Sequence, residues 1–181
     1  MLTLDISTLE PEEIIKRVDA LLPDPADFEM ELTYKAHFPL SRHVRETLAY
    51  LLKRNGVDDR WQNRFALISD ELVNNSIEHG SAGGETNSCY MKLGKGSDGV
   101  LALTLEVTDT GNGPHSKNAA QMVALLAEKK KTWFTDATRK RGRGFQIMEK
   151  LTDKVYFRDA TKGGLTVGVT KRFDAAMLAG K

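Results

Sequence analysis

The sequence predicts an α/β two-layer sandwich, in which helices cover one face of a mixed, mainly antiparallel sheet. Residues 28–38 and 100–109 alternate apolar and polar side chains, as half-buried strands do. Segments with helical periodicity separate these strands, and two strand pairs are joined by short turns typical of hairpins. The order helix, strand, two helices, hairpin, long loop, helix, hairpin favours a sheet that buries only one face.

The first half of the chain carries the predicted helical layer. Pro11 opens a short helix that ends before Pro23, and the strand at 28–38 follows it. Ser41 is predicted to cap the next helix, which ends at Asn55.

A longer helix is predicted from about Arg60 to His79, and it ends at the glycine-containing loop that follows. Asp58 or Asp59 would cap its first turn.

The second half of the chain supplies most of the sheet. Residues 88–93 and 100–109 form one predicted hairpin, and residues 114–141, without a strand pattern, are interpreted as a long loop. A short helix, GFQIMEKL, then precedes strands at about 154–158 and 165–171.

Composition limits the class of protein. The chain has 181 residues, a net charge of +1 and 40% hydrophobic residues, which predicts a globular domain without a polyanionic partner. We expect an N-terminal helical extension over 1–27 and the main domain over 28–181. The single cysteine, Cys89, and four histidines without metal-ligand spacing predict no cysteine-based zinc site. With no secretory leader or membrane span in the pattern, a cytoplasmic location is expected.

Three local patterns indicate chemistry. The first lies in the long helix, where Glu71, Asn75 and His79 recur every four residues and share a face next to the apolar stripe. A carboxylate beside an amide oxygen suits a hard cation such as Mg²⁺. An ordinary amphipathic helix with polar residues on its surface would give the same pattern.

The second pattern is Asp109-Thr-Gly111-Asn-Gly113 at the end of a predicted strand. Asp109 continues the series of inward-facing positions, so its carboxylate is predicted to face the helix layer and to need a donor. A ligand N–H could supply that donor, while the glycines would let the ligand approach the backbone. The alternative is a plain Asp-Thr-Gly turn.

The third pattern is Gly142-Arg-Gly144 at the start of a predicted helix, with Arg141 and Arg143 adding positive charge. Free backbone N–H groups at a helix start bind anions such as phosphate. A flexible loop entering a helix is the alternative, since a lone Gly-x-Gly is a weak signal.

Together, in this order, the three patterns resemble the N, G1 and G2 boxes of the GHKL superfamily of gyrase, chaperone and histidine-kinase ATPases. The resemblance covers about residues 28–172 and implies a Bergerat-type ATP-binding fold. Within the superfamily the chain looks most like the bacterial anti-sigma factor serine/threonine kinases.

The resemblance implies a role for individual residues. Glu71 would be the catalytic base, Asn75 the Mg²⁺ ligand and Asp109 the acceptor for adenine. The remaining residues implied in ATP binding are Gly111, Gly113, Arg141, Gly142, Arg143, Gly144, Phe145 and, as a secondary candidate, Thr166.

Residues 114–143 would form the ATP lid, and they carry eight basic against two acidic residues, a net charge of +6. The resemblance leaves two functions open. One is an ATP- and Mg²⁺-dependent serine/threonine kinase that phosphorylates an anti-anti-sigma (STAS-type) protein. The other is a non-catalytic module of the same fold that sequesters a sigma factor or another regulator. The chain could form a homodimer, and neither nucleic acid nor a membrane is an expected partner.

Overall fold

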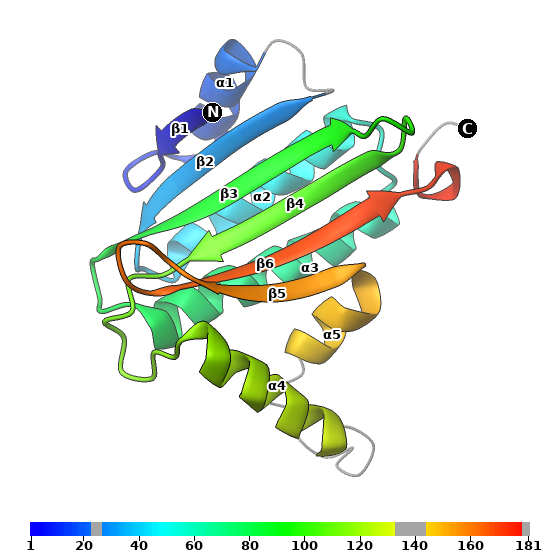
Figure 1. Cartoon of the computed structure of the whole chain (residues 1–181). Helices are drawn as coiled ribbons and strands as arrows, with labels where there is room; N and C mark the ends of the chain where they lie inside the picture. The colour runs from blue at the N-terminus through cyan, green and yellow to red at the C-terminus, as the bar shows by residue number, and fades with distance from the viewer. Residues whose placement is uncertain (23–26, 133–143, 179–181) are drawn as a thin grey trace.

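The computed structural model describes residues 1–22, 27–132 and 144–178, and it confirms the predicted two-layer architecture (Figure 1). One six-stranded sheet has the strand order β1-β2-β3-β4-β6-β5. β1 runs parallel to β2, and every other neighbouring pair is antiparallel. The strands are β1 Leu2–Asp5, β2 Phe28–Lys35, β3 Thr86–Lys95, β4 Leu101–Thr108, β5 Lys154–Asp159 and β6 Leu165–Phe173. The helices are α1 Pro11–Leu21, α2 Pro39–Arg54, α3 Asp59–Asn75, α4 Ala119–Thr132 and α5 Gly144–Leu151, with a π turn at Ser76–Gly80 and a 3₁₀ turn at Ala175–Met177.

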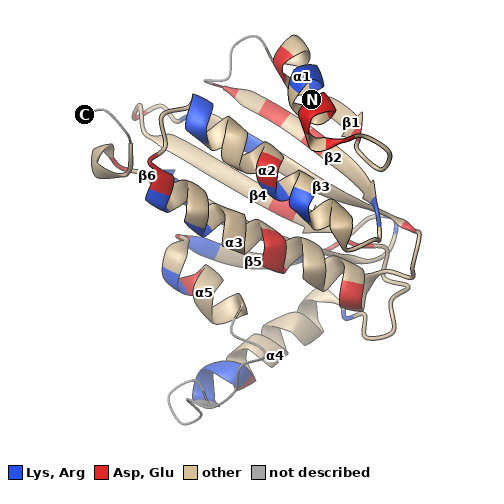
Figure 2. Ribbon diagram, turned by 180° about the vertical axis from the view of Figure 1, so that it is seen from behind, with Lys and Arg blue, Asp and Glu red and all other residues tan. Residues whose placement is uncertain are grey.

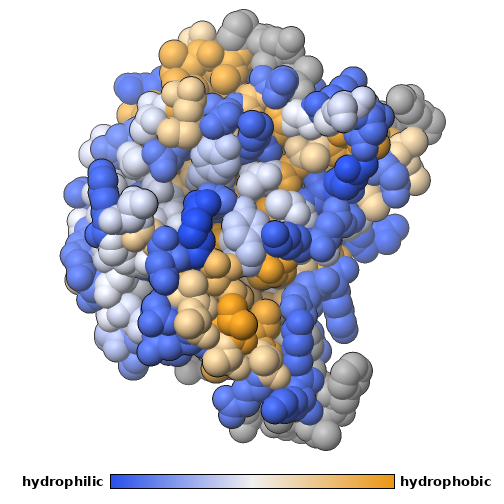
Figure 3. All heavy atoms as spheres, in the orientation of Figure 1, coloured by the Kyte–Doolittle hydropathy of each residue, from blue (hydrophilic) through white to orange (hydrophobic). Residues whose placement is uncertain are grey.

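α2 and α3 lie side by side across one face of the sheet (Figures 1 and 2). The strands send alternate apolar side chains into this layer, as β4 does with Leu101, Leu103, Leu105 and Val107, all 5% exposed or less. The opposite face of the sheet is largely polar (Figure 3). The core therefore lies between the sheet and the pair α2–α3.

The starts of the two central helices test the predicted caps. Asp58 caps α3, because its carboxylate accepts a hydrogen bond from the Trp61 amide at 2.8 Å. The predicted cap at Ser41 is wrong: α2 begins two residues earlier, at Pro39. The fixed φ of proline suits the first turn of a helix, where its missing N–H is not needed.

The long helix also ends differently from the prediction. α3 stops at Asn75, and the chain continues as the π turn to Gly80. Short π segments are rare and recur at functional sites, because the wider turn shifts the side chains that follow it.

Two elements have no counterpart in the sequence prediction. The first is β1, which adds a parallel edge strand to the sheet. α4 occupies part of the segment interpreted as a loop. Its start is a capping box, in which the Asn118 amide donates to Gln121 Oε1 at 2.9 Å and the Gln121 amide donates to Asn118 Oδ1 at 2.8 Å.

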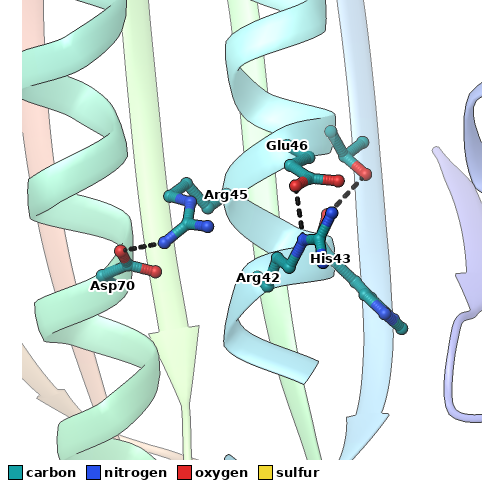
Figure 4. A network of polar contacts seen from close by, with 6 residues as sticks. Arg42, His43, Arg45, Glu46 and Asp70 are labelled. Carbon is teal, nitrogen blue, oxygen red and sulfur yellow. Dashed lines mark hydrogen bonds and ion pairs between the residues drawn. The ribbon is translucent and has the colours of Figure 1, made fainter. Parts of the chain in front are cut away.

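An ion pair joins the two central helices on the outside of the layer (Figure 4). Arg45 of α2 contacts Asp70 of α3 at 2.7 Å, with side chains 36% and 24% exposed. A pair this open contributes on the order of 1 kcal/mol or less, so apolar packing dominates the contact between α2 and α3. No helix within the described ranges is long and apolar enough to cross a membrane.

Candidate nucleotide site

A pocket of about 950 Å³ opens at one end of the helical layer. That volume is near the upper end of the range typical of small-molecule sites. Its walls come from α3, the π turn, β4, β6, α4 and α5, elements that are far apart in the sequence. The predicted residues that line it are Glu71, Asn75, His79, Asp109, Gly144 and Phe145.

Asp109 lies just beyond the end of β4 and faces the helix layer, as its parity predicts. Its Oδ1 accepts two backbone hydrogen bonds, from the Leu165 amide at 2.9 Å and from the Gly111 amide at 3.0 Å. No residue of the described ranges donates to Oδ2. Burial raises the pKa of the Asp109 carboxyl above its ordinary value, against the opposing effect of the two amides. One acceptor oxygen is thus left for a ligand.

The glycines of this loop shape it without lining the pocket. Gly111 has φ +76°, and a β-carbon there would lie 2.7 Å from the Gly164 amide nitrogen. A β-carbon on Gly113 would lie 2.2 Å from the His79 carbonyl oxygen, and the Gly113 amide donates to the Gly80 carbonyl at 3.1 Å. Only glycine allows the loop to pack this closely on the π turn and the β5–β6 turn.

Glu71 and Asn75 lie one turn apart on the pocket face of α3. The side-chain amide nitrogen of Asn75, Nδ2, donates to Glu71 Oε1 at 3.3 Å. Among the described residues, the side-chain oxygen of Asn75, Oδ1, is left for another partner. A β-carbon on Gly144 would lie 1.9 Å from Glu71 Oε1, which shows how closely the carboxylate approaches the first residue of α5.

The remaining predicted residues have different outcomes. Phe145 lines the pocket and packs against Phe157 with ring centroids 5.7 Å apart. Thr166 is not one of the described residues that line the pocket. Its hydroxyl is hydrogen-bonded to that of Thr108 at 2.8 Å, and both threonines lie on the face of the sheet opposite to Val167. The predicted residues Arg141, Gly142 and Arg143 lie outside the described residues.

Sequence reasoning missed the wall that α4 contributes. Met122, Leu125 and Lys129 line the pocket from this helix, and Phe38, 52% exposed, lines it from the start of α2. The signal that could have revealed α4 is the capping-box spacing Asn118-x-x-Gln121 before an apolar run.

Histidines lie beside the loop and the π turn. The His79 and His115 rings have centroids 5.9 Å apart, and the His115 amide donates to the His79 carbonyl at 3.3 Å. The Nδ1 atom of His79 is buried without a hydrogen-bond partner in the described part of the chain. The described residues contain no cluster of three or more His, Cys, Asp or Glu side chains that could hold a metal by itself.

Comparison with known protein families shows the class to which the chain belongs. Residues 39–171 match the family described as the histidine kinase-like ATPase domain, and the chain belongs to that family. A structure of the SiaB–SiaC complex from Pseudomonas aeruginosa contains a chain that is 8% identical to this one, with a TM-score of 0.47. The match covers 92% of this chain and 100% of that one. No curated protein sequence matches the chain.

Proposed function

We propose that the pocket binds ATP and that Asp109 recognises the adenine. The observation that carries this proposal is the arrangement of the Asp109 carboxylate, whose Oδ1 is held by two backbone amides while Oδ2 is left for a ligand donor. The exocyclic amine of adenine is such a donor, whereas guanine presents a carbonyl oxygen at that position. Val107 and Leu165 supply apolar walls for a flat base.

The residues at the opposite wall suit the phosphates and a cation. Asn75 offers its carbonyl oxygen, a ligand type that Mg²⁺ accepts, and the cation would neutralise phosphate charge. Since the described residues contain no cluster able to hold a metal alone, the nucleotide itself would supply most of the ligands. Lys117 and Lys129 line the same pocket and contribute positive charge.

Protein serine/threonine kinase activity is the function that this arrangement supports best. Glu71 lies in the pocket within hydrogen-bond distance of Asn75, so it could take the proton from an attacking hydroxyl close to the bound cation. The substrate would be an anti-anti-sigma (STAS-type) protein, with the chain acting as an anti-sigma regulator.

A second function, nucleotide-gated protein binding without phosphotransfer, is favoured by α4. One side of this helix lines the pocket through Met122 and Leu125, while Val123 on the other side is 57% exposed. Apolar residues gather over this helix on the surface (Figure 3). Nucleotide binding would then reposition an apolar helix face that a sigma factor or another regulator could recognise.

One experiment separates the two functions. ATP binding is measured by calorimetry with and without Mg²⁺, and the protein is then incubated with radiolabelled ATP, Mg²⁺ and candidate STAS-type proteins. Transfer of label to the partner supports the kinase. ATP-dependent capture of a partner without transfer supports the binding module. Absence of ATP binding would contradict both functions.

A further inference from the structure

A row of polar side chains crosses the sheet behind the pocket, at positions where the strand alternation predicts apolar residues. Tyr34 ends the inward series of β2 and Asn87 begins that of β3; they are directly paired across the strands and are 0% and 1% exposed. One residue beyond the last pair of β3 and β4, Ser88 with Thr108, the same register sets Asn87 beside Asp109. Buried polar groups are costly unless they are hydrogen-bonded, so this row requires partners.

The first partner is the π turn. Ser76, its first residue, pairs its hydroxyl with the Tyr34 hydroxyl at 3.0 Å and accepts a hydrogen bond from Asn87 Nδ2 at 3.1 Å. The Ser76 hydroxyl also donates to the Val73 carbonyl at 2.7 Å. The start of the π turn is therefore bonded to two neighbouring strands of the sheet.

The second partner is the loop that carries Asp109. Ser81 donates its hydroxyl to Asn87 Oδ1 at 2.5 Å, and the same oxygen of Ser81 accepts the Thr110 amide at 3.1 Å. Asn87 thus uses both ends of its amide: the nitrogen holds the start of the π turn, and the oxygen holds, through Ser81, the loop next to Asp109.

The π turn and the Asp109 loop are packed so closely that the distance between them can change very little. A β-carbon on Gly80 would lie 2.0 Å from Asp109 Oδ2, and the Gly113 amide donates to the Gly80 carbonyl. A small shift of the π turn relative to the loop would therefore displace the oxygen that is left for the ligand.

We propose that Asn87 is a positioning residue, which fixes the π turn relative to the Asp109 loop and thereby sets the base specificity of the pocket. The inference rests on the proposed function for its ligand, but the frame itself is tested without nucleotide. Asn87 has no contact with the ligand in this role; it acts through Ser76, Ser81 and Thr110.

The first test is hydrogen exchange of the protein without nucleotide. Asn87→Ala should lower the protection of the Thr110 and Gly113 amides by about tenfold or more, because the bonds that hold the loop lose their support. Cys89→Ala, on the same strand and face and completely buried, is the matched control and should leave these two amides unchanged relative to global stability. Unchanged protection in folded Asn87→Ala protein would overturn the inference, whether or not the protein binds ATP.

The second test is base discrimination, the ratio of the dissociation constants of inosine triphosphate and ATP. We expect about tenfold or more in favour of ATP for the unchanged protein and at least about threefold less discrimination in Asn87→Ala. A general loss of folded protein would weaken the binding of both nucleotides equally and leave the ratio of their dissociation constants unchanged. That result would overturn the inference. Equal binding of both nucleotides by the unchanged protein would instead contradict base recognition by Asp109, and with it the proposed function.

A milder variant covers the case in which Asn87→Ala does not fold. Ser81→Ala removes the hydroxyl that links Asn87 to the Thr110 amide but keeps Asn87 bonded to Ser76. It should lower the protection of Thr110 and the base discrimination in the same direction. Ser81→Ala protein with unchanged Thr110 protection and unchanged discrimination would overturn the inference as well.

Discussion

Gly80, the last residue of the π turn, lies directly against the carboxylate of Asp109. A β-carbon at position 80 would be 2.0 Å from Oδ2 and 2.5 Å from the Asp109 β-carbon, closer than side chains approach one another. Gly80 is also buried, and its carbonyl oxygen accepts the Gly113 amide at 3.1 Å. The site therefore exists only if residue 80 has no side chain.

Gly80→Ala should weaken ATP binding by at least about tenfold, equivalent to about 1.4 kcal/mol, because the added methyl group displaces the Asp109 carboxylate. Isothermal calorimetry measures the loss. Gly83→Ala is the matched control: it lies in the next loop, and a β-carbon there meets no atom within 4 Å. Equal affinity of the two variants would show that Asp109 does not contact the nucleotide.

Asp109→Asn tests the acceptor itself. The side-chain oxygen of the asparagine would accept the amides of Gly111 and Leu165, so its NH₂ group would face the amine of adenine. ATP should bind more weakly by about 1–3 kcal/mol, the cost of an unpaired buried group. Inosine triphosphate, with a carbonyl at that position, should lose less or gain affinity. An unchanged preference for ATP over inosine triphosphate would contradict the assignment.

The raised pKa of Asp109 predicts how ATP affinity depends on pH. Only the ionised carboxylate leaves Oδ2 as an acceptor, so ATP affinity should fall as the pH is lowered through the pKa of Asp109, which burial raises above its ordinary value. Titration of the nucleotide phosphates affects the pH dependence of ATP affinity equally in the unchanged protein and in Asp109→Asn. The variant therefore serves as the reference. The difference between the two pH profiles should disappear if Asp109 plays no part.

The contribution of Asp109 to the free energy of unfolding should depend on pH in the opposite direction to ATP affinity. Because burial raises the folded pKa above the unfolded value, the folded protein binds more protons between the two values. The contribution of Asp109 to the free energy of unfolding is therefore greatest below the unfolded pKa and falls as the pH rises through the folded one. Urea unfolding between acid and neutral pH, with Asp109→Asn as the comparison, measures this contribution.

Glu71 and Asn75 should separate chemistry from binding. Glu71→Ala should keep ATP affinity within a few-fold and lower phosphotransfer by about 10²–10⁴-fold, the usual contribution of a general base. Asn75→Ala should weaken both the Mg²⁺-dependent part of ATP binding and phosphotransfer, since it removes the proposed cation ligand. Phosphotransfer at the normal rate in Glu71→Ala would exclude Glu71 as the base.

The capping box of α4 offers a test of the pocket wall that this helix forms. Asn118→Ala removes the side chain that accepts the Gln121 amide, at a cost of about 0.5–2 kcal/mol to the helix. Hydrogen exchange should show faster exchange at Gln121 and Met122, and ATP affinity should fall because α4 forms one wall of the pocket. Glu128→Ala, exposed on the same helix and not among the pocket residues, is the control. Equal exchange in both variants would show that the cap does not determine the start of α4.

Much of the site could be predicted because its residues stand in local patterns. The alternation of β4 placed Asp109 toward the helix layer, and the four-residue spacing of α3 placed Glu71 and Asn75 on the pocket face. The turn and helix signals located five of the six strands and four of the five helices of the described chain. These features depend on the period of the backbone, which a sequence carries directly.

The tertiary structure alone decided which groups meet. The amide that holds Asp109 comes from Leu165, 56 residues away, and the side chain behind it, Asn87, is an isolated polar residue in an apolar series. Thr166 sits one position from a pocket residue yet faces the other side of the sheet. Contacts between distant segments leave no periodic trace in a sequence, since they depend on strand order and on how closely two backbones approach. The pairing of Gly80 with Asp109 is of this kind: each residue belongs to a recognisable local pattern, but their contact follows from the packing of α3 on the sheet.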